Sequence, residues 1–118
     1  MALQNTNPTT TKAWEKLQQH FQTMQTASMK EMFSEDASRA AKFHIKWEDF
    51  LVDYSKNRIN QETINLLLEL ANEVNLKLAI ASYFDGQAIN QTENRAVLHT
   101  ALRAPEKATV LVDGKNVM

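Results

Sequence analysis

The chain has no cysteine and only two glycines in 118 residues. Without cysteine it cannot form a disulfide, a cysteine-ligated zinc site or an iron–sulfur cluster, and this composition fits a reducing compartment. Average glycine usage of about 7% would give about eight glycines in a chain of this length. Little material is therefore present for the glycine-rich loops that bind phosphate groups.

An excess of one charge and long hydrophobic runs are also missing. The formal net charge is −1, and no cluster of Lys and Arg stands out, so nucleic-acid binding is not indicated. Residues 1–8 lack the basic start and apolar segment of a secretory signal, and the longest apolar runs are far shorter than a membrane span. We therefore expect a soluble, cytoplasmic chain that binds neither nucleic acid nor membrane.

The residues that are present indicate a folded chain of one domain or less. Hydrophobic residues make up 43% of the sequence, enough for a modest core at this length. Residues 1–9 are predicted to be a flexible tail, residues 10–104 a helix-rich segment, and residues 105–118 a strand and turn. No internal repeat, low-complexity segment or domain boundary is evident.

Apolar residues spaced three and four apart predict amphipathic helices. Asn75 is predicted to separate two of them, and Gly86 suits the left-handed position that follows the second. Asn60 suits an N-cap. The predicted helices begin at Thr10 or Thr11 and near Met29, Asn60 and Leu76.

In the middle of the chain the hydrophobic pattern changes to a period of two residues. Phe43, Ile45 and Trp47 alternate with polar residues, which predicts a half-buried strand, and residues 50–54 predict a second strand. We expect a two-stranded antiparallel hairpin near residues 42–54, with helices over its apolar face. Core packing is also the expected role of six large side chains: Trp14, Phe21, Met24, Phe33, Trp47 and Phe84.

A short strand is predicted again near the end of the sequence. Residues 108–112 have strand character, and Asp113-Gly114 suits a turn. This strand has no evident sequel, so we expect it to pair either with the earlier hairpin or with polypeptide beyond Met118.

Residues 89–103 predict a further short helix. Thr92 suits its N-cap and Glu93 its first turn, and Pro105 prevents continuation. With this helix, the predicted fold is α+β and mostly helical, with four to five helices, one hairpin and a short C-terminal strand.

Few residues are candidates for chemistry. Arg95, His99 and Arg103 would share one helical face. Contact with an anion is one interpretation of this face, and hydrogen bonding to a neighbouring segment is the favoured one. The histidines, which are His20, His44 and His99, match no metal-ligand spacing.

The polar group Ser55-Lys56-Asn57-Arg58 follows a predicted strand, where sites often lie. It lacks the glycine-rich loop or helix start of a phosphate site, so a turn anchored by Asn57, with cations at the surface, is favoured. Turns and helix starts also explain the prominent carboxylates, namely Glu35-Asp36, Glu48-Asp49 and Glu93.

Residues 90–103 (Asn-Gln-Thr-Glu-Asn-Arg-Ala-Val-Leu-His-Thr-Ala-Leu-Arg) closely resemble the N-terminal signature of the glucose-6-phosphate isomerases, also called phosphoglucose isomerases. Residues 53–59 (Asp-Tyr-Ser-Lys-Asn-Arg-Ile) resemble a second block of this family. Weaker similarities cover residues 11–20 and 112–118. The blocks occur in family order, so the resemblance extends over nearly the whole chain.

This resemblance implies an enzyme of glycolysis and gluconeogenesis that interconverts glucose 6-phosphate and fructose 6-phosphate. It implies acid–base proton transfer through a cis-enediol, no metal or organic cofactor, and a homodimer. The family's catalytic glutamate, arginine, histidine and lysine, and its glycine-rich phosphate motif, follow the matching segment. We therefore assign no catalytic, substrate-binding or metal-binding residue to this chain.

The resemblance further implies the N-terminal segment of a larger α/β enzyme of the sugar-isomerase (SIS) type. We expect the 118-residue fragment to be inactive alone and to have the remainder of the isomerase chain as its partner. One alternative is a free-standing helical interaction module without catalytic activity, because uncovered apolar faces would look the same in both cases. Another is a small metal-dependent enzyme.

Overall fold

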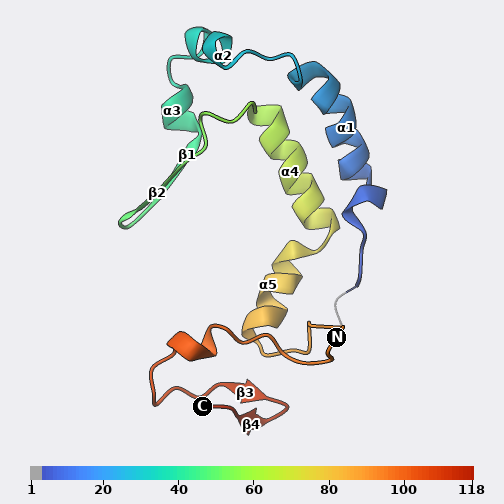
Figure 1. Cartoon of the computed structure of the whole chain (residues 1–118), viewed down its shortest axis with the longest axis vertical. Coiled ribbons are helices and arrows are strands. Elements are labelled where there is room, and N and C mark those ends of the chain that lie inside the picture. The colour runs from blue at the N-terminus through green and yellow to red at the C-terminus, as the bar shows by residue number, and fades with distance from the viewer. Residues whose placement is uncertain (1–3) are drawn as a thin grey trace. The chain divides into compact units, whose positions relative to one another are not determined.

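The computed structural model describes residues 4–118 and confirms the mostly helical α+β class (Figure 1). None of its helices, within these residues, has the length and apolar character needed to cross a membrane. In chain order the elements are η1 (Pro8–Thr10), α1 (Lys12–Met24), α2 (Met29–Glu35), α3 (Arg39–Lys42), β1 (His44–Trp47), β2 (Phe50–Asp53), α4 (Gln61–Glu73), α5 (Leu76–Phe84), η2 (Ala101–Arg103), β3 (Leu111–Val112) and β4 (Lys115–Asn116).

The chain forms two compact units. The first unit takes in the described residues up to Pro8 together with Ala71–Met118, and the second is Thr9–Leu70. The sequence gives no sign of a boundary at Leu70, because that boundary falls inside α4, where the helical pattern continues. The predicted division into residues 1–9, 10–104 and 105–118 stays a prediction.

The predicted tail leads into a capped helix. Residues 1–3 lie outside the described part, and Pro8–Thr10 forms a single 3₁₀ turn. The hydroxyl of Thr11 accepts a hydrogen bond from the Trp14 N–H at 3.2 Å, which satisfies one of the free donors at the start of α1. The helix predicted to begin near Thr10 is therefore confirmed.

Helices α1 and α4 lie side by side and antiparallel in the Thr9–Leu70 unit (Figure 1). Lys16 of α1 pairs with Glu69 of α4 at 2.7 Å, and His20 further along α1 contacts Thr63 nearer the start of α4. The ion pair is half exposed at both partners, so it contributes little to stability. Few apolar residues of the two helices are buried: Ala13 in α1 and Leu66 in α4.

Helix α4 begins as predicted at Asn60. The Asn60 side-chain oxygen accepts from the Thr63 N–H at 3.0 Å, while the Asn60 N–H donates to the Thr63 hydroxyl at 3.1 Å. This reciprocal pair satisfies two donors at the helix start in the manner of a capping box.

The short helix α3 is a finding that the hydrophobic period does not predict. Four residues make barely one turn, which is too short for a repeat of 3.6 to be visible. Asp36 organises the approach to it, because its carboxylate accepts from both the N–H (3.0 Å) and the hydroxyl (2.6 Å) of Ser38. Helix α2, whose N-cap is Ser28, confirms the helix predicted from Met29.

The predicted hairpin is present, and its register is Ile45 opposite Val52 and Trp47 opposite Phe50. The two-residue turn at Glu48 and Asp49 is also confirmed, with Glu48 at φ 50°. The expected burial is wrong, however, because every residue of both strands is exposed.

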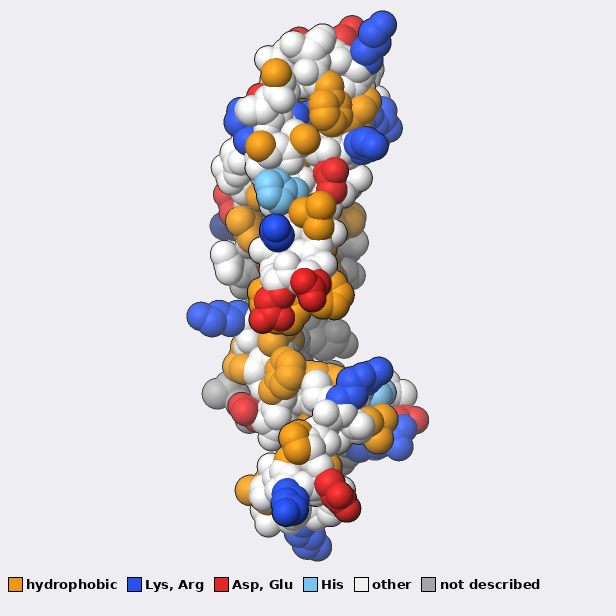
Figure 2. Space-filling view, turned by 90° about the vertical axis from the view of Figure 1, so that its left-hand side faces the viewer, with side chains coloured by type: hydrophobic (Ala, Val, Ile, Leu, Met, Phe, Trp, Pro, Cys, Tyr) orange, Lys and Arg blue, Asp and Glu red, His pale blue; other side chains and the backbone are white. Residues whose placement is uncertain are grey.

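The same correction applies to the predicted core side chains. Phe21, Trp47 and Phe84 are each more than half exposed, and Trp14, Met24 and Phe33 are only partly buried. Hydrophobic side chains accordingly reach the surface between charged ones (Figure 2). Amphipathic spacing correctly identifies an apolar face, but it does not specify whether another element covers that face.

In the Ala71–Met118 unit, α5 begins after Asn75, which adopts a left-handed φ of 56°. The helix ends at the C-cap Asp85, and Gly86 follows at φ 68°. Both sequence predictions are confirmed here. The left-handed conformation suits glycine because it has no Cβ to crowd the carbonyl oxygen.

The helix predicted over residues 92–103 is wrong. Asn90 and Arg95 instead exchange two backbone hydrogen bonds, of 3.1 and 3.2 Å, as an isolated antiparallel bridge. The Asn90 side-chain oxygen accepts from the Glu93 N–H at 3.2 Å, and Asn94 closes the turn at φ 50°. The polar residues that resemble a helix cap thus stabilise a tight turn, since Asn and Asp compete well for nearby backbone donors. Only the 3₁₀ turn Ala101–Arg103 remains helical.

The C-terminal strand finds its partner within the chain. Leu111 pairs with Asn116 and Val112 with Lys115, so β4 is the partner of β3, and the expected pairing with the earlier hairpin is wrong. The predicted turn is confirmed: Asp113 (φ 50°) and Gly114 (φ 74°) both take the positive angles of a tight hairpin turn.

Gly86 and Gly114 offer a matched test of packing in this unit. An added Cβ at Gly86 would lie 2.7 Å from the carbonyl oxygen of Leu111, whereas one at Gly114 meets nothing within 4 Å. Gly114→Ala should cost about 1–2 kcal/mol from its positive φ alone. Gly86→Ala should cost at least about 1 kcal/mol more because of the clash.

The measurement is urea denaturation of both variants, followed by circular dichroism. Equal losses at the two positions would contradict the close approach of the Gly86 backbone to β3.

Candidate functional site

The Thr9–Leu70 unit buries one charged side chain among its described residues, that of Arg39, which is only 3% exposed. Its Nε donates to the carbonyl oxygen of Ser55 at 2.7 Å, and its Nη2 donates to that of Asn57 at 2.6 Å. The guanidinium also lies over the rings of Phe43 (4.7 Å to the centroid) and Phe33 (5.7 Å). Charge-assisted hydrogen bonds and cation–π contacts together offset part of the cost of burying this cation.

These contacts fix the loop that follows β2, the polar group that the sequence singles out. The Ser55 N–H donates to the Asp53 carboxylate at 2.8 Å, and the Asn57 N–H donates to the Tyr54 carbonyl at 3.1 Å. The turn is therefore anchored at Asn57, as predicted, but through its backbone groups. Arg58 also contributes, since its Nη1 donates to the Gln25 carbonyl at 2.9 Å.

The sequence pattern does not single out Arg39. An arginine in a four-residue helix has no periodic signal, and its acceptors lie sixteen and eighteen residues away. The one available signal is the pair of flanking aromatic residues, Phe33 and Phe43, which form its cation–π contacts.

Two carboxyl groups near this loop have perturbed acidities. A hydrogen bond from Lys42, which has the largest effect, and hydrogen bonds from Ser38 lower the pKa of Asp36 to about 2. Hydrogen bonds from the side chain and backbone of Ser55 lower the pKa of Asp53. Both groups are therefore more strongly acidic than usual, which suits structural anions and not proton carriers at neutral pH.

The three histidines lie in different settings. The Nε2 of His20, which is buried, is 2.7 Å from the Thr63 hydroxyl, and its Nδ1 is 3.6 Å from the Glu62 carboxylate. His44 is exposed and donates from Nδ1 to the Ala40 carbonyl at 3.0 Å. His99 is exposed. Among the described residues no group of three or more His, Asp or Glu side chains is arranged to bind a metal ion.

Arg95, His99 and Arg103 do not share a helical face, because the expected helix is absent. The Glu93 carboxylate instead accepts from the Asn90 amide at 2.9 Å and forms an ion pair with the Arg95 guanidinium. The favoured interpretation, a helix face hydrogen-bonded to a neighbouring segment, is therefore wrong, although Arg95 does form a structural ion pair within its own turn.

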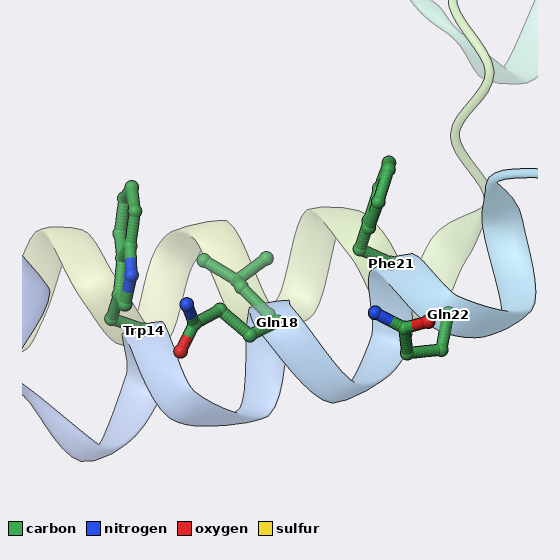
Figure 3. A pocket seen from close by; sticks show the side chains of 5 residues that line it. Trp14, Gln18, Phe21 and Gln22 are labelled. Atoms are coloured by element: carbon green, nitrogen blue, oxygen red, sulfur yellow. The ribbon is translucent and has the colours of Figure 1, made fainter.

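Three hollows of the Thr9–Leu70 unit are open to solvent. One follows a single face of α1, where Trp14, Leu17 and Phe21 form an apolar strip beside two glutamines (Figure 3). The rings of Trp14 and Phe21 point to the same side of the helix in that view. A second hollow adjoins Arg39, and a third, more polar one adjoins His20.

The described residues thus make a mostly helical segment whose polar contacts organise its own loops. Comparison with known sequences gives the family. Residues 53–118 match the family model described as phosphoglucose isomerase. The chain is also 59% identical, over 116 residues, to a protein from Christiangramia forsetii named glucose-6-phosphate isomerase.

That alignment covers 98% of this chain and 21% of the relative. The chain therefore belongs to the phosphoglucose isomerase family and spans about a fifth of the length of this curated relative. The two stronger family-like blocks, residues 53–59 and 90–103, fall within the residues that the family model matches.

Arg39 provides a direct test of the loop geometry. Arg39→Met should destabilise the chain by about 2–4 kcal/mol, because the carbonyl groups of Ser55, which is buried, and of Asn57 lose their charged donors. Arg39→Lys should recover only part of this loss, since an ammonium group cannot reproduce the planar fork.

Arg58→Met is the control, because Arg58 is exposed and bonds a single carbonyl; its cost should stay below about 1 kcal/mol. Urea denaturation gives all three values. A cost for Arg39→Met no larger than that for Arg58→Met would show that the Arg39 contacts are not important for stability.

Asp36 should make stability depend on acid pH. Because its pKa falls from 3.8 to about 2 on folding, its contribution is fully present above the unfolded value and is lost as the pH falls through about 2. Thermal melts of the wild type and Asp36→Asn should therefore differ at pH 5 and converge near pH 2. Lys42→Met should also lower the melting temperature at pH 5 more than at pH 2. A difference between the wild type and Asp36→Asn that persists at pH 2 would contradict the assignment of this pH dependence to the Asp36 carboxylate.

Proposed function

We propose that this chain is the N-terminal part of a glucose-6-phosphate isomerase, an enzyme that interconverts glucose 6-phosphate and fructose 6-phosphate. The identity of 59% over 116 residues to a protein of that name is the observation that carries the proposal. The family-model match over residues 53–118 supports it independently. An interaction module of unrelated function has no comparable support.

The catalytic groups of this reaction belong to the rest of the enzyme. Proton transfer between neighbouring carbons needs groups that titrate near the working pH and contact the substrate. The two described carboxyl groups with resolved shifts, Asp36 and Asp53, become more acidic and bond neighbouring structural groups. The role of this chain is therefore to build the enzyme's framework, and no residue of it is proposed to touch the sugar phosphate.

The partners follow from the same proposal. The remainder of the isomerase polypeptide is the main partner, the complete enzyme is a homodimer in the cytoplasm, and the sugar phosphate binds outside this segment. No cofactor takes part in the reaction.

The purified 118-residue chain should show no turnover. The assay mixes it with fructose 6-phosphate and a reporter enzyme that responds to glucose 6-phosphate. A chimera in which this chain replaces the matching segment of the Christiangramia forsetii enzyme should be active at a level comparable with the parent.

The parent enzyme without that segment is the control and should be inactive or fail to accumulate. Turnover by the isolated chain that survives purification would contradict the proposal. So would a folded chimera with no isomerase activity.

A further inference from the structure

The β1–β2 hairpin has two chemically different faces. Side chains alternate along a strand, so the observed register places four apolar residues on one side, which we name the apolar hairpin face: Ile45, Trp47, Phe50 and Val52. The opposite face carries three polar residues and one leucine: His44, Lys46, Asp53 and Leu51.

The apolar hairpin face is open to solvent. Its four side chains are between 56% and 65% exposed. The rings of Trp47 and Phe50 stack on each other with their centroids 5.6 Å apart, which orders the two largest side chains in advance. An antiparallel sheet with one apolar face is normally packed on that face, and a two-stranded hairpin needs such cover for stability.

We propose that the apolar hairpin face is the surface on which the remaining polypeptide of the isomerase docks. This inference rests on the proposed function and adds to it a specific contact. The face consists of four uncharged apolar side chains, so the complementary surface must itself be apolar.

The length of the relative indicates which partner this is. The aligned segment is 21% of the Christiangramia forsetii protein, so about four fifths of that chain lies outside the match and is available to cover the face.

A second copy of this chain fits less well. Four residues on each of two strands span roughly 14 by 10 Å, far below the roughly 800 Å² per partner of a stable protein interface. So small a patch suffices when a covalent connection supplies a high effective concentration, as it does within one polypeptide.

The test compares the two faces of the hairpin in the chimera described above. The docking variant is Ile45→Thr with Val52→Thr, which keeps β-branched side chains and strand propensity but adds hydroxyl groups. The control is Leu51→Thr, because Leu51 lies on the opposite face and is 64% exposed, similar to the docking residues.

In the chimera the docking variant should lower the melting temperature by at least about 3 °C more than the control. In the isolated 118-residue chain, where both faces are open, the two variants should differ little. Equal shifts in melting temperature for the two variants of the chimera would overturn the proposal that this face is a docking surface. This holds even if the isomerase activity of the chimera supports the proposed function.

Light scattering of the isolated chain tests whether a second copy of the chain covers the apolar hairpin face. A monomer agrees with docking inside one polypeptide. A dimer that dissociates in the docking variant but persists in Leu51→Thr would assign the face to a second copy and overturn the inference. An unmodified chimera that folds without activity would contradict the proposed function, while the melting comparison would still decide which face is covered.

Discussion

The buried guanidinium of Arg39 is the constraint on which the Thr9–Leu70 unit depends. It joins the short helix α3 to the loop after β2 through the carbonyls of Ser55 and Asn57. A buried cation costs free energy unless its donors are satisfied, so the loop geometry and the position of α3 fix each other. The hairpin β1–β2 lies between these two attachments in the sequence, and its base is therefore fixed while its strands remain exposed.

Polar contacts are prominent because the apolar core is small. Three hydrophobic residues are buried in the described chain, namely Ala13, Phe43 and Leu66, while sixteen large hydrophobic side chains are exposed. Five polar or charged residues are also buried, among them Arg39, His20 and Ser55. Hydrogen bonds can fix a geometry, but burial of apolar area supplies most of the folding free energy. Exposed faces on several elements are therefore what a family segment covering a fifth of its relative is expected to show.

Local sequence signals predicted local structure well. Thr11, Asn60 and Gly86 marked helix ends because each satisfies or relieves particular backbone groups. Alternation identified the β1–β2 hairpin and its apolar side. These features depend on residues a few positions apart, so the sequence alone contains the necessary information.

The predictions that were wrong or missing each depended on a contact that the local sequence pattern does not encode. The stretch after Asn90 contains good cap residues and an apolar stripe, yet its side chains stabilise a bridge between Asn90 and Arg95. The importance of Arg39 rests on acceptors far along the chain, and the expected burial of Trp47 and Phe84 required covering elements. The family resemblance, in contrast, came from motif identity and agreed with the comparison.

Amide hydrogen exchange is the most direct measurement of whether this segment is built to be covered by a larger enzyme. It compares residues 45–52 in the isolated chain and in the active chimera. Exchange of the hairpin amides should be fast in the isolated chain and slowed by at least about tenfold in the chimera, because packing raises the free energy of local opening. Equal protection in the two proteins would show that the hairpin gains nothing from the rest of the isomerase.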